Sequence, residues 1–296
     1  MNVRWYNRLR RAGGREILSS EATKPQQYID NRQDISGEEE EKAMAKARIL
    51  YYDLETAPNL AAVWGKYEQN VIWFEDEWYV MSFAYKWEGE RKTHVVALPD
   101  FPLYEEDSDN DLEVVKALHD LFAEADIVIA HNGDRFDLRV INARFVFHGL
   151  TPPPPFQTID TLKVARRYFR FNSNKLDDLG DYLGLGRKRQ TGGYRLWRDC
   201  MAGDKVAWNK MKLYNKQDVR LLERVYKKLR PWMKGHPRVT PDATGRSCPK
   251  CGGWLQRRGY QRSKTMIYHR FQCQSCGGWS RERLPSKFVE KPMVTD

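Results

Sequence analysis

The chain of 296 residues has no run of about 18 consecutive apolar residues, the length that a membrane-spanning helix needs. Its N-terminus also lacks the apolar segment of a secretory signal. We therefore expect a cytoplasmic protein, in the host cytoplasm if the chain is viral, that does not contact a membrane. Internal repeats and long low-complexity tracts are absent as well.

Acidic residues are missing from the first 15 positions, which hold five arginines. An organelle transit peptide, a nucleic-acid-binding arm and a solvated leader share this composition. We favour a charged, partly disordered leader over residues 1–47. Acid-to-base pairs four positions apart within residues 38–46 predict a short exposed helix there.

Cysteine is scarce, and four of the five cysteines form two Cys-x-x-Cys pairs with 21 residues between them. This number and spacing of cysteines is typical of a metal site and not of a disulfide framework. Each pair can place two sulfurs near one tetrahedral ion, so we predict a zinc ribbon over residues 247–285 with one structural Zn²⁺. Its ligands would be Cys248, Cys251, Cys273 and Cys276. A metal-free or redox-active pair is the alternative.

The chain carries 50 Lys and Arg against 40 Asp and Glu, a net charge of +10. Such a surplus favours a polyanionic partner such as nucleic acid. Residues 240–296 alone hold 11 basic and 4 acidic side chains, so the excess is concentrated in the cysteine-rich end. The 41% hydrophobic content is enough for one substantial core and a small appendage.

Strand-like and helix-like segments alternate from residue 48 onward, which predicts an α/β domain over residues 48–234. A linker at 235–246 would join it to the ribbon, and a tail at 286–296 would follow the ribbon. Four prolines at 152–155 interrupt the alternation as a stiff spacer or a docking motif. The expected strands are 47–55, 78–87, 93–98 and 126–130, and the expected helices are 109–125, 136–149, 161–170, 175–183 and 204–230.

Two acids near the end of the first strand, Asp53 and Glu55, lie on one face of it. Both faces of that strand are otherwise apolar, which predicts a central strand covered on each side. Two adjacent carboxylates in such a place repel each other and lose hydration, so a cation should compensate them.

Two further acids interrupt apolar patterns, Asp218 on the stripe of the last helix and Asp137 at the start of a helix. Each has a structural explanation: Asp137 could favour the helix dipole, Asp218 could pair with an arginine, and the first two acids could flank a loop. Taken together, the four acids predict a pair of Mg²⁺ or Mn²⁺ ions about 3.5–4 Å apart, the arrangement that clamps a phosphoryl transfer.

Three spaced motifs carry a resemblance to a known family. They are Asp53-Leu-Glu55-Thr56, the run from His131 to Asp137, and Tyr214-Asn-Lys-Gln-Asp218. In this order they resemble the exonuclease motifs of the four-acid (DEDD) nucleases. These enzymes have the RNase H-like (DnaQ-like) fold, a mixed sheet flanked by helices. Residues 48–234 look similar to exonuclease domains related to family B polymerases, in a bacteriophage form.

The resemblance implies a role for each matching residue. Asp53, Glu55 and Asp218 would hold the ion that activates water, and Asp53 would bridge to a second ion that Asp137 supports. Tyr214 would orient the attacking water, as in the tyrosine branch of the family, because position 213 is a leucine and not a histidine. The implied activity is 3′-5′ exonuclease. An inactive nucleic-acid-binding scaffold, an endonuclease and a ribonuclease on the same fold remain open.

Candidate substrate contacts lie outside the acids. Single-stranded DNA is the favoured substrate, and a replication or repair protein is a further partner to consider. Each candidate contact has another interpretation. Asn132 could form a turn, Phe136 could belong to the core, the basic loop could be solvated, and the ribbon could dock on protein. Asp160, Asp177 and Asp178 are interpreted as helix caps or first-turn acids. The candidate contacts are Asn132, Phe136, Arg187, Lys188, Arg189, Arg257, Arg258 and Tyr260.

Overall fold

The computed structural model describes residues 45–67, 70–241, 246–263 and 266–283. The tail at 286–296, the short helix and nearly all of the leader predicted above lie outside these residues. The described residues divide into a small unit, residues 59–77, and a larger unit that holds the rest. Each is described by itself.

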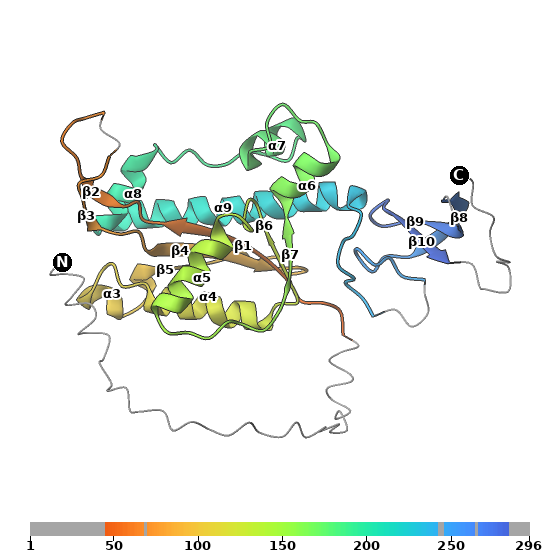
Figure 1. The fold of residues 1–296 in the computed structure, drawn as a ribbon, viewed down its shortest axis with the longest axis horizontal. Helices are drawn as coiled ribbons and strands as arrows, with labels where there is room; N and C mark the ends of the chain where they lie inside the picture. Colours follow the sequence, from red (N-terminus) through yellow and green to blue (C-terminus); the bar gives the residue numbers. More distant parts are fainter. Residues whose placement is uncertain (1–44, 68–69, 242–245, 264–265, 284–296) are drawn as a thin grey trace, which may run out of the picture. The chain divides into compact units, whose positions relative to one another are not determined.

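A five-stranded mixed sheet forms the centre of the larger unit (Figure 1). The strand that carries the two acids, β1, is the middle strand, as predicted from its two apolar faces. It pairs antiparallel with β4 and parallel with β6, and β7 runs parallel to β6 at one edge. The strands, in spatial order, are β5 (His94–Ala97), β4 (Val80–Trp87), β1 (Ile49–Thr56), β6 (Ile127–Ala130) and β7 (Gln157–Asp160).

Helices cover both faces of this sheet, which confirms the predicted fold class. On one face Leu50 and Tyr52 pack in a core with α4 and α5, and on the other Ile49 and Tyr51 pack in a core with α6, α7 and α9. The helices are α3 (Leu103–Glu106), α4 (Leu112–Glu124), α5 (Asp137–Phe147), α6 (Thr161–Tyr168), α7 (Leu176–Tyr182), α8 (Tyr194–Met201) and α9 (Lys205–Leu229), with short 3-10 turns η1 (Leu98–Asp100) and η2 (Arg230–Trp232).

The longest of these helices, α9, begins where Asp204 accepts hydrogen bonds from the backbone amides of Val206 and Ala207. Its apolar stripe is buried against β1, β4 and β5. Because Asp218 is on that stripe, the helix carries a carboxylate into the interior beside β1.

The cysteine-rich end folds as a three-stranded antiparallel sheet, β8 (Leu255–Arg262), β9 (Ile267–Cys273) and β10 (Trp279–Arg283). Its buried cluster consists of only three residues, Cys248, Leu255 and Cys273. The first Cys-x-x-Cys knuckle contacts η2, which follows α9, because the Lys250 ammonium donates to the Pro231 carbonyl at 2.9 Å. This small core agrees with the expectation that a metal staples the segment.

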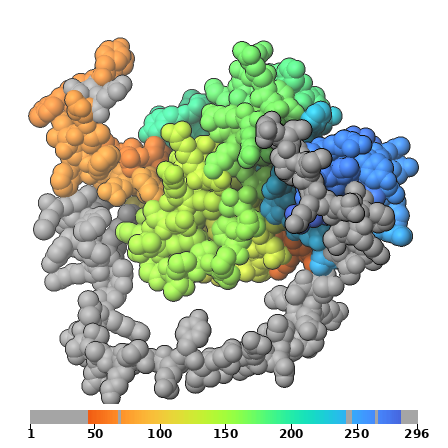
Figure 2. All heavy atoms as spheres, turned by 45° about the vertical axis from the view of Figure 1, so that its right-hand side comes forward, coloured from red at the N-terminus to blue at the C-terminus, as the bar shows by residue number. Residues whose placement is uncertain are grey.

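The small unit contains a hairpin of β2 (Leu60–Ala62) and β3 (Trp73–Asp76), orange in Figure 2, that the sequence pattern did not predict. Trp64 and Tyr67 are each 88% exposed in its connection. In the parts of the chain that the structure describes, no helix combines the length and apolarity needed to cross a bilayer.

Candidate active site and cysteine cluster

Three carboxylates converge at the end of β1. Asp53 and Glu55 come from the strand and Asp218 comes from α9, and one ligand oxygen of each lies within 4.8 Å of the others. Asp218 is fully buried, and the two strand acids are half-buried. Oxygen atoms at this spacing can share one divalent cation, since Mg²⁺ and Mn²⁺ prefer carboxylate and water ligands.

Asn215, which the sequence analysis did not single out, positions Asp53. Its side-chain amide donates to Asp53 Oδ2 at 3.0 Å and to the Asp53 carbonyl at 3.2 Å. The signal was present in the sequence, because Asn215 lies between Met211 and Asp218 on the same helical stripe.

Asp137, the fourth predicted acid, is the first residue of α5 and is 5% exposed. It does not belong to the group of three within 4.8 Å. The backbone of Leu54, between the two strand acids, acts to lower the pKa of Asp137, and the charge of Asp137 acts on Asp53. The structure thus places it next to the cluster but not within it.

The four carboxylates are short of compensating charge. Burial, followed by the charge of Asp218, raises the pKa of Asp53 to about 8, and burial raises the pKa of Asp137 to about 7. The pKa values of Glu55 and Asp218 are also raised, in each case chiefly by burial. A carboxylate that takes up a proton can no longer bind a metal ion well. A bound cation would lower these pKa values and keep all four groups ionised at neutral pH.

Lys188 lies within the acid cluster and not on the open surface of its loop. Its ammonium donates to Asp218 Oδ2 at 2.6 Å and to the Tyr214 hydroxyl at 3.4 Å. Burial acts to lower the pKa of Lys188, but the charges of Asp53 and Asp218 outweigh it and raise that pKa. One ammonium therefore partly balances the four carboxylates.

Tyr214 stands beside the same carboxylate on α9. Its hydroxyl accepts the hydrogen bond from Lys188, and its ring meets the edge of Trp197 of α8 at 6.1 Å between centroids. Burial and then the charge of Asp218 raise the pKa of Tyr214, so the phenol stays protonated. Trp197 was missed because the helix that carries it was not predicted.

The loop after β6 has a restricted backbone. Asn132 has φ +68°, a left-handed conformation that Asn tolerates better than most residues, and its amide donates to Asp160 Oδ1 at 2.9 Å. A Cβ on Gly133 would lie 2.4 Å from the Cβ of Ala130, so only glycine fits there. Phe136 is 46% exposed just before Asp137, which excludes a core role.

The interpretation of three further acids as helix caps or first-turn residues is confirmed. Asp160 Oδ1 accepts from the backbone amides of Leu162 and Lys163 at the start of α6. Asp177 and Asp178 lie in the first turn of α7.

The other two basic loop residues lie outside the cluster. Arg187 approaches the carboxylates of Asp177 at 3.6 Å and Asp181 at 3.8 Å, and Arg189 is exposed. The Lys188 backbone amide donates to Asp177 Oδ1 at 2.6 Å, which anchors the loop on α7. Of the three predicted phosphate contacts, the structure brings only Lys188 to the acids.

The four predicted zinc ligands lie together, with all sulfurs within 4.8 Å of one another. The Sγ atoms of Cys248 and Cys276 are 3.9 Å apart, and those of Cys251 and Cys273 are 3.6 Å apart. Sulfurs bound to one tetrahedral Zn²⁺ at about 2.3 Å would be separated by about 3.8 Å, so the arrangement fits the ion and not a disulfide.

Backbone amides donate to these sulfurs. The amides of Gly253 and Gly278 donate to Cys251 and Cys276, each at 3.4 Å. Such bonds stabilise thiolates, the form of cysteine that binds a metal.

The described ribbon, residues 246–263 and 266–283, is the blue part of Figure 2, and many of its basic and aromatic side chains are exposed. It contains eight Lys and Arg and one acid. Arg257 lies over the ring of Tyr260 at 5.1 Å and donates to its hydroxyl at 2.7 Å. Arg258 is exposed next to this pair. The three predicted contacts thus occupy one strand of the ribbon.

The chain is similar to a known protein superfamily and to a solved polymerase structure. The sequence profile of the RNase H superfamily matches residues 75–230, which include Asp137, Tyr214 and Asp218 but begin after β1. No curated protein matches the chain. Among solved structures, the chain is similar to the family B DNA polymerase of the hyperthermophilic archaeon Pyrobaculum calidifontis, with 17% identity and a TM-score of 0.48. The match covers 63% of this chain and 25% of the polymerase.

Proposed function

Because the chain belongs to the RNase H superfamily, we propose that it is a nuclease that uses Mg²⁺ or Mn²⁺ to shorten single-stranded DNA from the 3′ end. The observation that carries the proposal is the convergence of Asp53, Glu55 and Asp218, whose carboxylates are short of positive charge. The direction of attack rests on the resemblance of the three motifs, in order, to those of the four-acid exonucleases.

The residues divide between two cation positions. Asp53, Glu55 and Asp218 would hold one ion, and Asp53 with Asp137 would hold the second. When bound, the ions polarise the phosphodiester and lower the pKa of an attacking water. The wider placement of Asp137 suits an outer ligand that acts through water.

The chain's own groups would orient the reaction. The Tyr214 side chain contacts Lys188 through its hydroxyl and Trp197 through its ring, and the neutral phenol is a donor and acceptor that can align the attacking water. This role would correspond to that of the tyrosine in the tyrosine branch of the DEDD nucleases, whose motifs the chain resembles. Once cations neutralise the carboxylates, the Lys188 ammonium is free to bind a phosphate oxygen of the strand.

The zinc ribbon would hold the strand at a distance from the reacting end. Its cationic side chains can pair with phosphates, and Tyr260 offers a ring on which a base can stack. Removal of residues beyond about 240 should weaken DNA binding and reduce its salt dependence. Unchanged binding would instead assign the ribbon to a protein partner.

A gel assay tests the proposal. A 20-nucleotide DNA strand labelled at its 5′ end should give a ladder that shortens from the 3′ end in Mg²⁺ or Mn²⁺, and no ladder without them. Cleavage of a circular strand would identify an endonuclease, and a preference for the matched RNA strand would identify a ribonuclease.

A scaffold without activity is the second candidate, and the ion pair between Lys188 and Asp218 is the observation that favours it. In that case Mn²⁺ would fail to displace the ammonium, and electron paramagnetic resonance would detect no bound ion even at millimolar concentration.

A further inference from the structure

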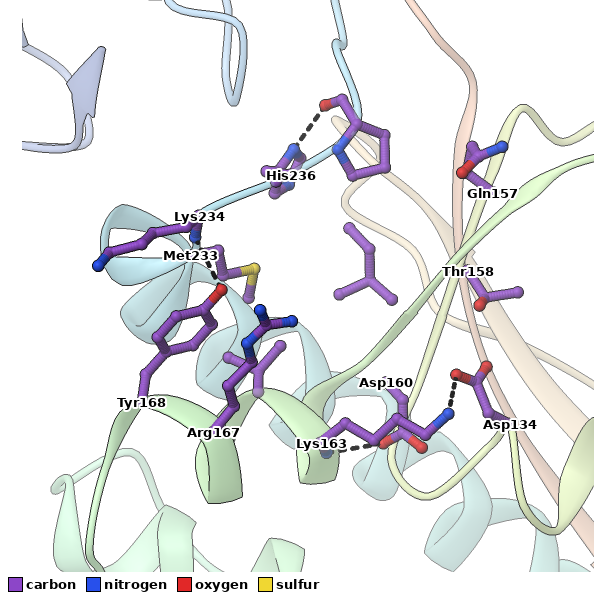
Figure 3. A pocket seen from close by; sticks show the side chains of 14 residues that line it. Asp134, Gln157, Thr158, Asp160, Lys163, Arg167, Tyr168, Met233, Lys234 and His236 are labelled. Carbon is purple, nitrogen blue, oxygen red and sulfur yellow. Dashed lines mark hydrogen bonds and ion pairs between the residues drawn. The ribbon is translucent and has the colours of Figure 1, made fainter. Parts of the chain in front are cut away.

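A cavity of about 310 Å³ lies beside β7, the edge strand of the sheet (Figure 3). Its walls come from β7, from α6 and from residues 233–237, which follow η2. Small-molecule sites in proteins commonly occupy about 300–1,000 Å³, so the cavity has room for a single group of roughly nucleotide size.

The floor of the cavity is apolar. Ile159 and Met233 line it and are almost completely buried, and Val164 adds an aliphatic side chain from α6. The Tyr168 hydroxyl accepts a hydrogen bond from the Lys234 amide at 3.1 Å, which ties α6 to the segment that forms the opposite wall. This floor can receive the flat face of a base.

The charged lining of the cavity consists of three cations, Lys163, Arg167 and Lys234, and two carboxylates, Asp134 and Asp160. Arg167 and Lys234 are exposed lining residues, and within the part of the chain that the structure describes neither forms an ion pair. Figure 3 shows the Arg167 side chain extending from α6 toward Met233 and His236. Lys163 is already paired with Asp134 at 2.7 Å, so the two unpaired cations are the ones that can receive an anion.

His236, the remaining ionisable group on this wall, does not add a charge. One ring nitrogen faces the Tyr226 hydroxyl at 2.7 Å and the other faces the Pro237 carbonyl at 2.6 Å. Burial lowers the pKa of His236 to about 4, so it is neutral at physiological pH. Asp134 is paired with Lys163, and Asp160 accepts backbone amides at the start of α6, so Arg167 and Lys234 leave an excess of positive charge beside the apolar floor. This combination fits a base attached to a phosphate.

The position of the cavity relates it to the acids. Strands β1, β6 and β7 are parallel, so their carboxyl ends lie at the same edge of the sheet. Asp53 and Glu55 are near the end of β1, and the lining residue Asp160 is at the end of β7, two strands away. Neighbouring strands are about 4.8 Å apart, so the two places are roughly 10 Å apart, which corresponds to a few nucleotides.

The other side of the cavity is continuous with the ribbon. Residues 233–237 follow Pro231, whose carbonyl accepts the hydrogen bond from Lys250 in the first zinc knuckle. The Val239 amide donates to the Pro249 carbonyl at 2.8 Å in the same knuckle. The cavity thus lies along the chain between the acid cluster and the ribbon surface.

We propose that this cavity is a nucleotide subsite, which takes one nucleotide of the strand whose 3′ end lies at the acids. The base would lie against Ile159 and Val164, and its phosphate would contact Arg167 and Lys234. The inference rests on the proposed nuclease function and adds a specific place where the strand is gripped. A free nucleoside monophosphate has the same chemistry, so the test includes it.

Binding of a 12-nucleotide DNA strand carrying a 5′ fluorescein, measured by anisotropy without added divalent cations, tests the subsite. Arg167→Ala and Lys234→Ala should each weaken binding about three- to tenfold and lower the slope of log K against log salt by about 0.7. Thr158→Phe places a ring at the cavity wall without changing charge, and should weaken binding at unchanged slope.

The matched control is Arg170→Ala, an exposed arginine three positions after Arg167 that does not line the cavity. It should leave binding within about twofold of wild type. If all three cavity variants bind as the control does, while thermal unfolding shows each to be folded, the subsite is wrong. If Thr158→Phe fails to fold, the two charge variants still decide the question.

Titration with adenosine 5′-monophosphate separates the two sources of a nucleotide. The strand subsite predicts that the cavity variants lose affinity for the 12-mer. If they lose affinity for the mononucleotide alone, the cavity holds a free nucleotide and the strand assignment is overturned.

Hydrolysis of the same 12-mer in Mg²⁺ separates this inference from the function on which it rests. If the wild-type protein binds the 12-mer through the cavity but does not hydrolyse it, the nuclease proposal is contradicted and the subsite is supported. If the wild-type protein hydrolyses the 12-mer and the cavity variants bind and hydrolyse it as well as the wild type does, only the subsite is contradicted.

Discussion

The acid cluster and the cysteine cluster both bring together side chains that could bind a metal ion, but they stand in opposite relations to the fold around them. The three carboxylates are held by β1 and α9, which large buried side chains such as Tyr51, Tyr52 and Tyr226 fix in place. The four sulfurs are held in a segment whose buried cluster has three residues, two of them cysteines. In the first site the fold holds the ligands together, and in the second the ligands hold the fold.

The magnitudes make the contrast sharper. Full burial of one large apolar side chain contributes about 1.5–3 kcal/mol, so the many buried residues around β1 and α9 can offset the repulsion of adjacent carboxylates. The ribbon lacks such burial, whereas binding of a structural Zn²⁺ contributes about 10–16 kcal/mol in small zinc domains. Loss of metal should therefore affect activity at one site and folding at the other.

The largest expected effect is on hydrolysis by Asp53→Ala. Asp53 is the proposed shared ligand of the two cations, so its removal should lower the rate of strand shortening by about 10³-fold or more, since metal stabilisation contributes several kcal/mol to such reactions. The melting temperature of the metal-free variant should exceed that of the wild type above about pH 8, because only there is the wild-type Asp53 carboxylate ionised and repelled by its neighbours. Substantial activity in this variant would contradict the assignment of the site.

Cys248→Ser tests the other half of the comparison. It should reduce bound zinc from one ion per chain to none by elemental analysis, and hydrogen exchange should lose protection in residues 246–283 alone. Protection of β1 and α9 should remain, since neither depends on the ribbon for its core. Loss of protection throughout the chain would show that the ribbon is needed for the whole fold.

Lys188→Met should separate charge balance from substrate binding. Without the competing ammonium, the Mg²⁺ concentration at half-maximal activity should fall about tenfold, because a hydrogen bond to a charged group contributes about 1.5–3 kcal/mol. KM for the strand should rise if Lys188 also contacts a phosphate. Lys188→Arg is the control that keeps the charge, and an unchanged metal requirement in Lys188→Met would exclude the competition.

The two clusters should also respond to pH in opposite directions. In the folded metal-free protein the pKa values of Asp53 and Asp137 are raised to about 8 and about 7, so the folded state holds protons that the unfolded chain has released. Their stabilising contribution is complete below pH about 4 and is lost as pH rises through about 7 and 8. Thermal unfolding with Mg²⁺ omitted should show this decline, and Asp53→Asn should reduce it.

The ribbon should instead lose stability as pH falls, because protons compete with Zn²⁺ for the thiolates. Hydrogen exchange between pH 5 and 9 resolves the two parts. A common pH trend in β1 and β9 would contradict the comparison.

The sequence predicted those parts of the molecule in which a charged side chain interrupts a regular pattern of apolar residues. The two apolar faces of β1 located the central strand, and the stripe of α9 located Asp218 in the interior. Asn215 lies on the same stripe, but an uncharged amide interrupts an apolar pattern less distinctly than a carboxylate does.

Other features have no such pattern. Helix α8 is eight residues long and includes Arg195, Arg198 and Asp199, so its apolar face is too short to recognise. Strand β2 has only three residues. Lys188 was expected on an exposed loop, and its place among the acids follows from tertiary contacts with Asp177 and Asp218 that no local rule contains.

Helix α9, with η2 after it, leads from the acid cluster to the contact with the first cysteine knuckle, and its length sets the distance between them. Asp218 lies 13 residues before Pro231, which contacts the zinc knuckle, and at 1.5 Å per residue this interval spans about 20 Å. A strand rising about 3.4 Å per nucleotide needs roughly six nucleotides to reach that far. Helix α9 would therefore act as a ruler: oligonucleotides shorter than this would gain nothing from an intact ribbon, and processive shortening would end in a short, poorly held remnant.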